Sequence, residues 1–443
     1  MKKEDTTLTN DIEILEEAKN FYQKLYNAEQ TNLIDQEWIL QQLEKKLTET
    51  DKGLCEGPMT EKETTNALKE IDNNKSPGPD GIPAEFYKHF WDLLKQPLTD
   101  LFNYNFDNET MTESQQTALL KLLFKKNDIE LLKNWRPISL LNTNYKIAAK
   151  VITTRLKHVL GSITHEDQTC GIPGRNIYEN LFKLRDTVYN AHKHKQQLIM
   201  ISLDQEKAFD RVDRDFLNKT MDKLNFGPSF KNWIKTLYKD ANCTIINNGW
   251  MSDPVTLQRG LRQGCPLSPL LYAMIAESIG QAIRNDPRIK GVHIPGDNGK
   301  TDKISQYADD ATLILKDGIS VQRAFDVVNR YERGSGSKLN YEKSEGIYIG
   351  QQEGKNTGPV PITWKTDNIA VLGTQIGPSL EQDWDKPVAK LLKRIQGWYS
   401  RNLTIYSRAH LDHQNLRSGK SDLSAYNFFY SGEGDRRSAP SDF

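Results

Sequence analysis

The spacing of hydrophobic positions predicts helices in the first part of this chain. Between residues 11 and 47, apolar side chains recur every three or four positions, which is typical of helical structure. Thr60 and Glu63 have the spacing of a capping box and predict the start of a short helix. Pairs of apolar residues at intervals of four, from Ile147 to Leu160, predict a longer amphipathic helix that serves in packing.

The pattern changes at Leu198. The six residues LIMISL are largely apolar and predict a short, buried strand that ends at Asp204. Apolar residues then return at helical spacing from Phe209 to Leu224. Asp204 is therefore expected at the carboxyl end of a strand, where the chain turns toward a helix. Acidic residues are depleted inside strands, but at strand ends they are common in active sites.

Two further segments complete the pattern. Ser268 and Pro269 predict an N-cap and a first helical position, and a buried stripe follows through Ile283. The stretch SQYADDAT, residues 305–312, predicts a strand–turn–strand hairpin with Asp309 and Asp310 at its tight end. Helices and strands interleave along the chain, with antiparallel signals near this hairpin. The predicted fold class is α+β, with helices on one face of a sheet.

Length and composition set the broad class. A chain of 443 residues is expected to form two or three subdomains. No apolar run is long enough for a membrane helix, and the first residues lack the apolar core of a signal peptide, so we expect an intracellular protein with no membrane partner. Lys and Arg together number 59, as do Asp and Glu, and this balance neither supports nor excludes a nucleic-acid partner. The four widely spaced cysteines favour free thiols over disulfides or zinc.

The adjacent carboxylates of Asp309 and Asp310 have two interpretations. Most such pairs are solvated turn residues. Alternatively, Asp204 and this pair converge on one edge of a sheet, where three carboxylates would need divalent cations, and their hard oxygen ligands suit Mg²⁺. Two such ions about 3.5–4 Å apart would activate an attacking oxygen and stabilise a leaving one, as in phosphoryl transfer. Spacing alone leaves the two interpretations balanced.

Motifs elsewhere in the chain change that balance. They are, in chain order, SPGPDGI (76–82), RPISLLN (136–142), GIPGR (171–175), DQEKAFD (204–210), RQGCPLSP (262–269), YADD (307–310), GSKLN (336–340) with Lys343–Ser344, and Leu372–Gly373. In this order, and over about residues 60–377, they resemble the motifs of reverse transcriptases from LINE-type, non-LTR retrotransposons. YADD resembles the Y-x-D-D box of those enzymes, and DQEKAFD resembles their first catalytic motif.

The resemblance implies a right-hand polymerase architecture, with fingers, a palm that has an antiparallel sheet, and a partial helical thumb. We expect a helical N-terminal extension at 1–60, fingers at 61–195 and a palm with the catalytic motifs at 196–377. The reverse transcriptase domain itself would span about 115–377. A partial thumb at 378–411 and a disordered, divergent tail at 412–443, rich in Ser, Gly, Asp and Arg, would follow.

The resemblance also implies a reaction. Asp204 and Asp309 would hold two Mg²⁺ ions, for which Mn²⁺ is a candidate substitute, and Asp310 would support or share that coordination. A primer 3′-hydroxyl would attack the α-phosphate of a dNTP and release pyrophosphate. The expected partners are an RNA template, a DNA primer and dNTPs.

Three residues would face the nucleotide and the template. By resemblance, Phe209 would lie under the sugar of the incoming nucleotide and exclude a 2′-hydroxyl, although the same residue also begins the apolar stripe that follows it. Gln263 and Gly264 would face the templating pair and the nucleotide, and glycine there permits a close approach of the backbone.

Basic residues would hold the triphosphate and the template. Arg136 would contact the triphosphate, and Lys125 and Lys126 are alternative second phosphate contacts between which the sequence does not choose. Lys343 would either protonate the leaving pyrophosphate or simply face water. The candidate template track combines cations with aromatic rings. Its members are Lys390, Lys393, Arg394, Trp398, Tyr399, Arg401 and Arg408.

Departures from the family pattern leave alternatives open. The endonuclease domain and the Cys/His-rich segment of complete elements are not visible, so we expect a fragment of a longer retroelement product. One alternative to an active RNA-templated DNA polymerase is a non-catalytic relic that at most binds RNA. A second alternative is an RNA-dependent RNA polymerase, against which the YADD box and Phe209 argue. The resemblance implies nuclear action, although no clear basic localisation run supports it.

Overall fold

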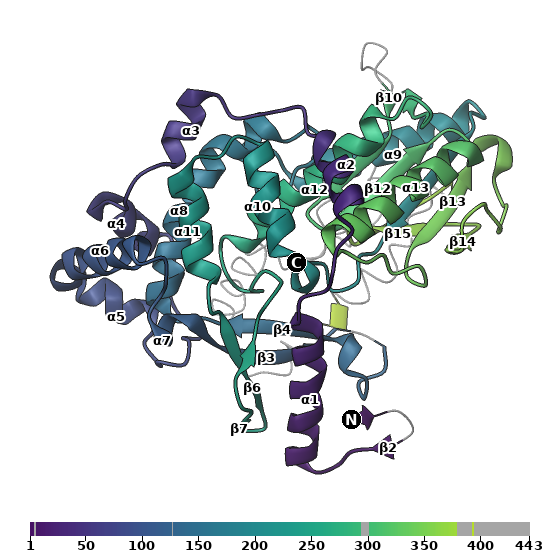
Figure 1. The fold of residues 1–443 in the computed structure, drawn as a ribbon. Coiled ribbons are helices and arrows are strands. Elements are labelled where there is room, and N and C mark those ends of the chain that lie inside the picture. The colour runs from purple at the N-terminus through teal and green to yellow at the C-terminus, as the bar shows by residue number, and fades with distance from the viewer. Residues whose placement is uncertain (4–5, 126, 294–300, 379–391, 394–443) are drawn as a thin grey trace, which may run out of the picture.

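Two five-stranded sheets organise the computed structural model, which describes residues 1–3, 6–125, 127–293, 301–378 and 392–393. The first sheet has the strand order β11-β12-β5-β13-β14, and the second has the order β4-β3-β6-β7, with β8 also pairing with β6. In Figure 1 the first sheet lies on the right with α9, α12 and α13, and the second lies at the bottom beside α1.

The first sheet is built around β5, which is apolar on both faces. Its strands are β5 (Leu198–Leu203), β11 (Ile304–Tyr307), β12 (Asp310–Leu315), β13 (Glu345–Ile349) and β14 (Thr363–Lys365). The first four strands of the order pair antiparallel, and β14 pairs parallel with β13. Ile199 and Ile201 pack into the same core as α12 (Ser268–Asn285) and α13 (Gly318–Ser335).

Helices cover both faces of this sheet. Leu198 and Met200, which point to the other side of β5, pack with Leu184 and Val188 of α9 (Ile177–Lys193). The prediction of helices on one face only is therefore wrong for this sheet. The physical reason is that LIMISL has no polar face to leave in water, so each side of the strand needs a cover.

The second sheet joins segments that are distant in the chain. It contains β3 (Thr117–Phe124), β4 (Trp135–Leu140), β6 (Asn242–Asn247), β7 (Trp250–Met251) and β8 (Val255–Thr256). β3 pairs antiparallel with β4 and parallel with β6. The N-terminal helix α1 (Asp11–Tyr26) packs on β6, β7 and β8, which Figure 1 shows at the bottom of the molecule.

The remaining helices surround α8 (Thr143–Ile163), the long central helix, which contacts α3, α4, α11 and α12. They are α2 (Leu33–Gln41), α3 (Glu49–Cys55), α4 (Glu61–Lys69), α5 (Ala84–His89), α6 (Trp91–Asp107), α7 (Glu113–Gln116), α10 (Arg214–Lys223) and α11 (Pro228–Tyr238). The short strands are β1 (Lys2–Lys3), β2 (Thr6–Thr7), β9 (Val292–His293), β10 (Thr301–Asp302), β15 (Ile369–Val371) and β16 (Thr374–Ile376). The 3₁₀ turns are η1 (Leu132–Asn134), η2 (Ala208–Arg211) and η3 (Gly350–Gln352).

Several local predictions are confirmed. Thr60 and Glu63 form the reciprocal hydrogen bonds of a capping box at the start of α4. The paired apolar stripe lies in α8, and SQYADDAT forms the hairpin of β11 and β12. All four cysteines are buried and free. Within the described residues, no helix is both long enough and apolar enough to cross a membrane.

Three local predictions are wrong. The region 11–47 is not continuously helical, because α1 ends at Tyr26 and the Asn32 side chain caps a new helix, α2. Phe209 lies in the turn η2 and not in the following helix, which begins only after Asp213 caps α10. Ser268 is the first residue of α12 and not its N-cap, because its hydroxyl donates to the Arg262 carbonyl oxygen at 2.8 Å.

Other predictions lie outside the described residues. They concern most of the thumb at 378–411, the tail at 412–443, Lys126, and every member of the candidate template track except Lys393.

Candidate active site

The paired aspartates lie in a two-residue hairpin turn. Tyr307 pairs with Asp310, which leaves Ala308 and Asp309 as the loop. Ala308 has a φ of 52°, and two-residue hairpin turns of types I′ and II′ need a positive φ at this first loop position. β12 pairs antiparallel with β5, and Ala311 lies opposite Leu203. Asp310, which precedes Ala311, and Asp204, which follows Leu203, therefore lie side by side. The fold thus brings the three predicted carboxylates to one end of the first sheet.

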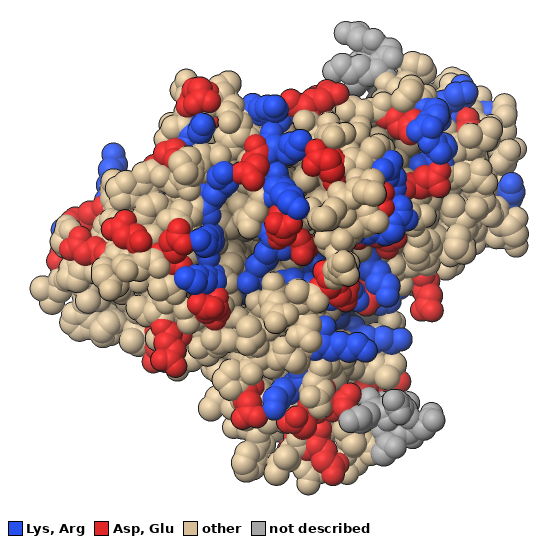
Figure 2. All heavy atoms as spheres, viewed as in Figure 1, with Lys and Arg blue, Asp and Glu red and all other residues tan. Residues whose placement is uncertain are grey.

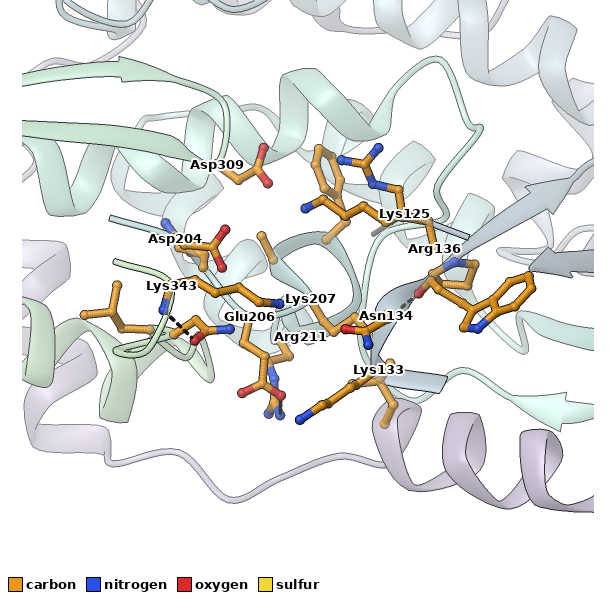
Figure 3. A pocket seen from close by; sticks show the side chains of 18 of the residues that line it. Lys125, Lys133, Asn134, Arg136, Asp204, Glu206, Lys207, Arg211, Asp309 and Lys343 are labelled. Atoms are coloured by element: carbon orange, nitrogen blue, oxygen red, sulfur yellow. Dashed lines mark hydrogen bonds and ion pairs between the residues drawn. The ribbon is translucent and has the colours of Figure 1, made fainter. Parts of the chain in front are cut away.

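A cleft of about 890 Å³ opens beside this end of the sheet. Asp204 and Asp309 line one side, and Lys125 and Arg136 project from the opposite side (Figure 3). Phe209, Gln263 and Lys343, also predicted as site residues, line the same cleft. Gly264 and Asp310 lie next to lining residues without lining the cleft themselves.

The pKa values of Asp309 and Asp310 depend on burial and on the charged side chains nearby. Burial raises the pKa of Asp309, with a further contribution from the negative charge of Asp204, whereas the positive charges of Lys125 and Arg136 oppose that rise. Asp310 has an exposed side chain, yet the protein packed around its carboxyl group raises its pKa to about 6, and repulsion from Asp309 and Asp204 adds to this effect. Neighbouring carboxylates that repel each other in this way are stabilised by a cation placed between them.

These carboxylates suit Mg²⁺ that is bound partly by the protein and partly by the phosphates of a substrate. Among the described residues, no three His, Cys, Asp or Glu side chains converge into a ready-made metal cage. Mg²⁺ commonly binds proteins through one or two carboxylates, completing its shell with water and substrate phosphates. Asp204 and Asp309 offer two such carboxylates on one side of a cleft that is large enough for a nucleotide.

The backbone around Asp204 is held by the loop that follows α13. Its amide donates to the Ser344 hydroxyl at 3.1 Å, and its carbonyl oxygen accepts from the Asn340 amide at 2.7 Å. The same loop carries Lys343, whose side chain is exposed at the cleft wall. The sequence therefore placed Lys343 near the site, while its role as a proton donor stays a prediction.

Arg136 and Lys125 come from the adjacent ends of β3 and β4. Arg136 pairs across the ladder with Leu123, and the Lys125 amide donates to the Asn134 carbonyl oxygen at 3.0 Å. Both side chains are exposed and face the carboxylate side of the cleft (Figure 3). Lys126 is outside the described residues, so the structure does not compare the two lysines directly.

Phe209 is held by a second aromatic ring. Its ring lies 4.9 Å from that of Tyr272, centroid to centroid, with an interplanar angle of 32°. The Tyr272 hydroxyl donates to Gln205 Oε1 at 2.6 Å, which fixes the supporting ring in turn. Phe209 is half-buried and lines the cleft, so it contributes both to packing and to the cleft wall.

Gly264 approaches the backbone of β4 closely. The Gln263 carbonyl oxygen accepts from the Ser139 amide at 2.7 Å. A Cβ atom on Gly264 would lie 2.6 Å from the Ser139 carbonyl oxygen, and its φ of 108° is unfavourable for other residues. Gly264 is therefore in close contact with β4, and its expected position beside the nucleotide stays a prediction.

Two residues near the cleft were not singled out from the sequence. Lys207 has a φ of 51°, donates to the Trp135 carbonyl oxygen, and has a pKa that burial lowers. Asp210 is buried and accepts hydrogen bonds from Tyr26 and Gln263. The motif that contains both residues could have drawn attention to them, but only the fold shows what they contact.

Asp210 should make the stability of the protein depend on pH. Burial raises its pKa from 3.8 to about 7, against the opposing charge of Lys207. Because the folded state holds this proton more tightly than the unfolded chain, the stabilising contribution is complete below pH 3.8 and is lost as pH rises through 7. Asp210→Asn removes this titration. Relative to the wild type, the variant should therefore gain about 2–3 kcal/mol in unfolding free energy between pH 5 and pH 8.

Urea unfolding of both proteins at the two pH values measures this difference. Asp215→Asn, a change in a largely exposed side chain on α10, is the control and should follow the wild type. An unchanged difference between wild type and Asp210→Asn would show that Asp210 titrates normally.

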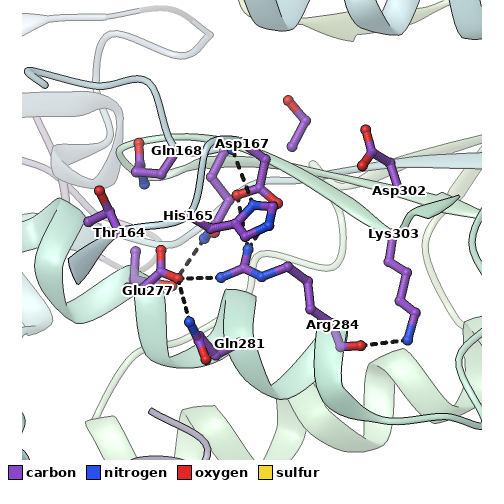
Figure 4. Close-up of polar contacts among 12 residues, drawn as sticks. Thr164, His165, Asp167, Gln168, Glu277, Gln281, Arg284, Asp302 and Lys303 are labelled. Atoms are coloured by element: carbon purple, nitrogen blue, oxygen red, sulfur yellow. Dashed lines mark hydrogen bonds and ion pairs between the residues drawn. The ribbon is translucent and has the colours of Figure 1, made fainter. Parts of the chain in front are cut away.

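The segment before α9 supports the hairpin from the side, and Figure 4 labels Asp167 and Gln168 of this segment. The Gln306 amide donates to the Asp167 carbonyl oxygen at 3.0 Å, and the Thr169 amide donates to the Gln306 carbonyl oxygen at 3.2 Å. Gln168 Oε1 accepts from the amide of Ala308, the loop residue with positive φ, at 3.2 Å. No pattern in the sequence marks this support, because it depends on side-by-side placement of distant segments.

A buried ion-pair network anchors that support to α12. Arg284 Nη1 lies 2.9 Å from both carboxylate oxygens of Asp167, and Arg284 also pairs with Glu277 (Figure 4). Asp167 and Glu277 are both buried. Although burial alone would raise it, the hydrogen bond from His165 and the charge of Arg284 hold the pKa of Asp167 below its ordinary value.

Arg284→Met should destabilise the fold strongly, because it leaves two buried carboxylates without their shared cation. Breaking a buried ion pair by removing one partner costs about 3–5 kcal/mol. Arg185→Met is the control, since both that side chain and its ion-pair partner Asp186 are largely exposed, so the replacement should have little effect. Urea unfolding at pH 7 measures both variants, and equal midpoints for the two would contradict an anchoring role for Arg284.

The chain is similar to known proteins over most of its length. Residues 124–376 match the family described as reverse transcriptase (RNA-dependent DNA polymerase). The chain is 35% identical over 423 residues to the transposon TX1 uncharacterized 149 kDa protein of Xenopus laevis, covering 94% of this chain and 32% of that protein. It is 22% identical over 319 residues to the Pol polyprotein of the type-2 element R2DM of Drosophila melanogaster, covering 68% and 28%.

A third relative is the RNA-directed DNA polymerase from mobile element jockey of Drosophila funebris. The identity is 24% over 284 residues, which cover 62% of this chain and 29% of that protein. The chain thus spans about a third of the length of the curated relatives it matches.

Proposed function

Because this chain belongs to the reverse transcriptase family of non-LTR retrotransposons, we propose that it synthesises DNA on an RNA template. The reverse transcriptase domain implies fingers and a palm; we assign the first sheet to the palm and β3 and β4 to the fingers. The observation that carries the proposal is the cleft itself, in which Asp204 and Asp309 face Lys125 and Arg136. Opposed acidic and basic walls suit a substrate that is a metal-bound triphosphate.

The residues of the cleft have distinct proposed roles. Asp204 and Asp309 would hold Mg²⁺, or Mn²⁺ in its place, with Asp310 supporting the charge balance. The bound ions would lower the pKa of the primer 3′-hydroxyl and neutralise the triphosphate. Arg136 and Lys125 would bind the phosphate oxygens from the other wall. The in-line attack on the α-phosphate then needs little beyond this placement.

Two further residues would act on the nucleotide. Phe209 would exclude a 2′-hydroxyl by its bulk, since Tyr272 supports its ring from behind. Lys343 is the candidate proton donor to the leaving pyrophosphate, because it is exposed at the cleft wall on the loop that also holds Asp204.

The proposed partners are an RNA template, a DNA primer and dNTPs, and the proposed place of action is the nucleus. Lysine and arginine gather in bands on the face shown in Figure 2, with acidic residues between them. The formal net charge of zero therefore conceals local basic surface, which is what a phosphate backbone needs. The proposed domain division remains fingers at 61–195 and palm at 196–377, with the thumb and the divergent tail after residue 377.

Primer extension tests this function. The protein is incubated with poly(rA)/oligo(dT), dTTP and Mg²⁺, with a metal-free reaction and an Asp204→Asn variant as controls. We expect extension by the wild type alone, and only when Mg²⁺ or Mn²⁺ is present. Absence of extension by a folded wild-type chain that still binds the RNA–DNA duplex would refute the polymerase and favour a non-catalytic relic. Preference for UTP over dTTP would instead indicate an RNA polymerase.

A further inference from the structure

The N-terminal helix α1 forms part of the cleft wall. Phe21, Lys24 and Leu25 of this helix line the cleft together with the catalytic motifs. These residues precede the region that matches the reverse transcriptase family, which begins at residue 124. A helix outside the matched domain is therefore built into the site.

A chain of hydrogen bonds connects α1 to Gln263. The Tyr26 hydroxyl donates to Asp210 Oδ1 at 3.2 Å, and Gln263 Nε2 donates to Asp210 Oδ2 at 2.9 Å. Tyr26 is 3% exposed and Asp210 is 1% exposed. Water therefore cannot readily replace the hydrogen bond between these two side chains if it is lost. Gln263 reaches from this buried pair to the surface of the cleft.

The carboxylate of Asp210 selects one orientation of the Gln263 amide. An ionised carboxylate only accepts hydrogen bonds, so the amide nitrogen must face Asp210 and the amide oxygen must face away from it. The backbone of Gln263 is fixed separately, because its carbonyl oxygen accepts from the Ser139 amide. Main chain and side chain of Gln263 are thus both held, each from a different element.

The end of α1 also holds the segment just before Gln263. The Tyr26 carbonyl oxygen accepts from the amides of Gln258 and Arg259, at 3.0 and 3.2 Å. The Arg259 side chain is buried, donates to the Leu25 carbonyl oxygen at 2.8 Å and pairs with Glu29 at 2.7 Å. These contacts fix the loop that carries Gln263 to the end of α1.

We propose that Tyr26 and Asp210 are positioning residues that orient Gln263 toward the pair of templating base and incoming nucleotide. The helix α1 then takes part in nucleotide selection without touching the reacting atoms. This inference rests on the proposed polymerase function, since it assigns a role within that site.

Tyr26→Phe removes one hydroxyl group and keeps the buried ring. Losing this hydrogen bond should raise the KM for the correct dNTP about fivefold, with a smaller effect on kcat, and should increase misincorporation by a similar factor. The assay is run at pH 8, where Asp210 is ionised. Tyr22→Phe is the matched control. Its ring lies one turn earlier on α1, and its buried hydroxyl has no hydrogen-bond partner among the described residues, so its kinetics should equal those of the wild type.

Two further variants separate positioning from general stability. Asp210→Asn can present either its oxygen or its nitrogen to Gln263, so it no longer selects one orientation of the Gln263 amide and should raise the KM for the correct dNTP without destabilising the fold at pH 8. In a Gln263→Met background, Tyr26→Phe should no longer change the KM, because the residue being oriented is absent. A Tyr26→Phe effect that persists in that background would overturn the proposal.

Hydrogen–deuterium exchange gives a test that needs no catalysis. Because the amides of Gly260 and Leu261 donate to the carbonyl oxygens of Val212 and Phe209, on either side of Asp210, Tyr26→Phe should increase exchange about fivefold in peptides that cover residues 258–266, whereas Tyr22→Phe should leave it unchanged. If the wild type fails to extend primers but the two variants change exchange as stated, the polymerase function is refuted and the coupling of α1 to Gln263 is supported. Equal exchange and equal KM in Tyr26→Phe and wild type would refute the coupling itself.

Discussion

Asp309→Asn is expected to reduce the rate of primer extension at least about 10³-fold, which corresponds to about 4 kcal/mol in activation free energy. Asp309 lies in the two-residue turn of the hairpin and lines the cleft opposite Lys125 and Arg136. An amide has nearly the same shape as the carboxylate but no negative charge, so it would bind Mg²⁺ weakly at best. Removal of a single neutral hydrogen-bond donor from an active site already costs about 10²–10³ in rate.

Single-turnover extension with saturating dTTP measures this loss. Asp326→Asn, which changes an exposed carboxylate on α13, should retain the wild-type rate. The affinity for primer–template should change little in Asp309→Asn, since Asp309 is assigned to the metal ions and not to the template. Extension at more than a tenth of the wild-type rate would remove Asp309 from the proposed catalytic set.

Phe209→Val should abolish most of the discrimination against ribonucleotides. The ring lines the cleft and is supported by Tyr272, so it cannot retreat when a 2′-hydroxyl meets it. Valine opens the space of several carbon atoms. The preference for dTTP over UTP, expressed as a ratio of kcat/KM values, should therefore fall by about 100-fold, the order of magnitude for a steric contact of this size.

Phe209→Tyr is the informative partner variant, because it keeps the bulk of the ring and should keep the preference. Phe209 also packs in the core around η2, so thermal unfolding of both variants should accompany the kinetics. A Val variant that is folded and active but still rejects UTP would show that the ring serves in packing alone.

The sequence predicted those features of the fold that depend on local pattern. The hairpin around Asp309, the strand before Asp204 and the capping box at Thr60 were all accessible, because turn chemistry, apolar runs and cap spacing act within a few residues. The motif order predicted which side chains would line one cleft. The structure places Asp204, Phe209 and Gln263 there together.

The sequence did not predict features that arise from contact between distant segments. The double cover of β5 depends on α9 and α12 meeting opposite faces of one strand. The roles of Gln168 and Asp210 depend on Ala308 and Gln263, which lie 140 and 53 positions further along the chain. Nothing in local periodicity marks a glutamine or an aspartate as the partner of a residue so far away.

The pairing of α1 with later segments has a consequence for how the protein is made. Domains form as units during synthesis at about 5–20 residues per second, and long-range contacts form slowly. On the ribosome, the hydrogen bond between Tyr26 and Asp210 can form only after the 184 positions up to Asp210 have been synthesised, and this synthesis takes roughly 10–40 s at those rates. During that interval the apolar side of α1, with Leu15, Ala18 and Tyr22, has no partner strand. The nascent chain is therefore a natural client for chaperones until β6 and β8 have emerged.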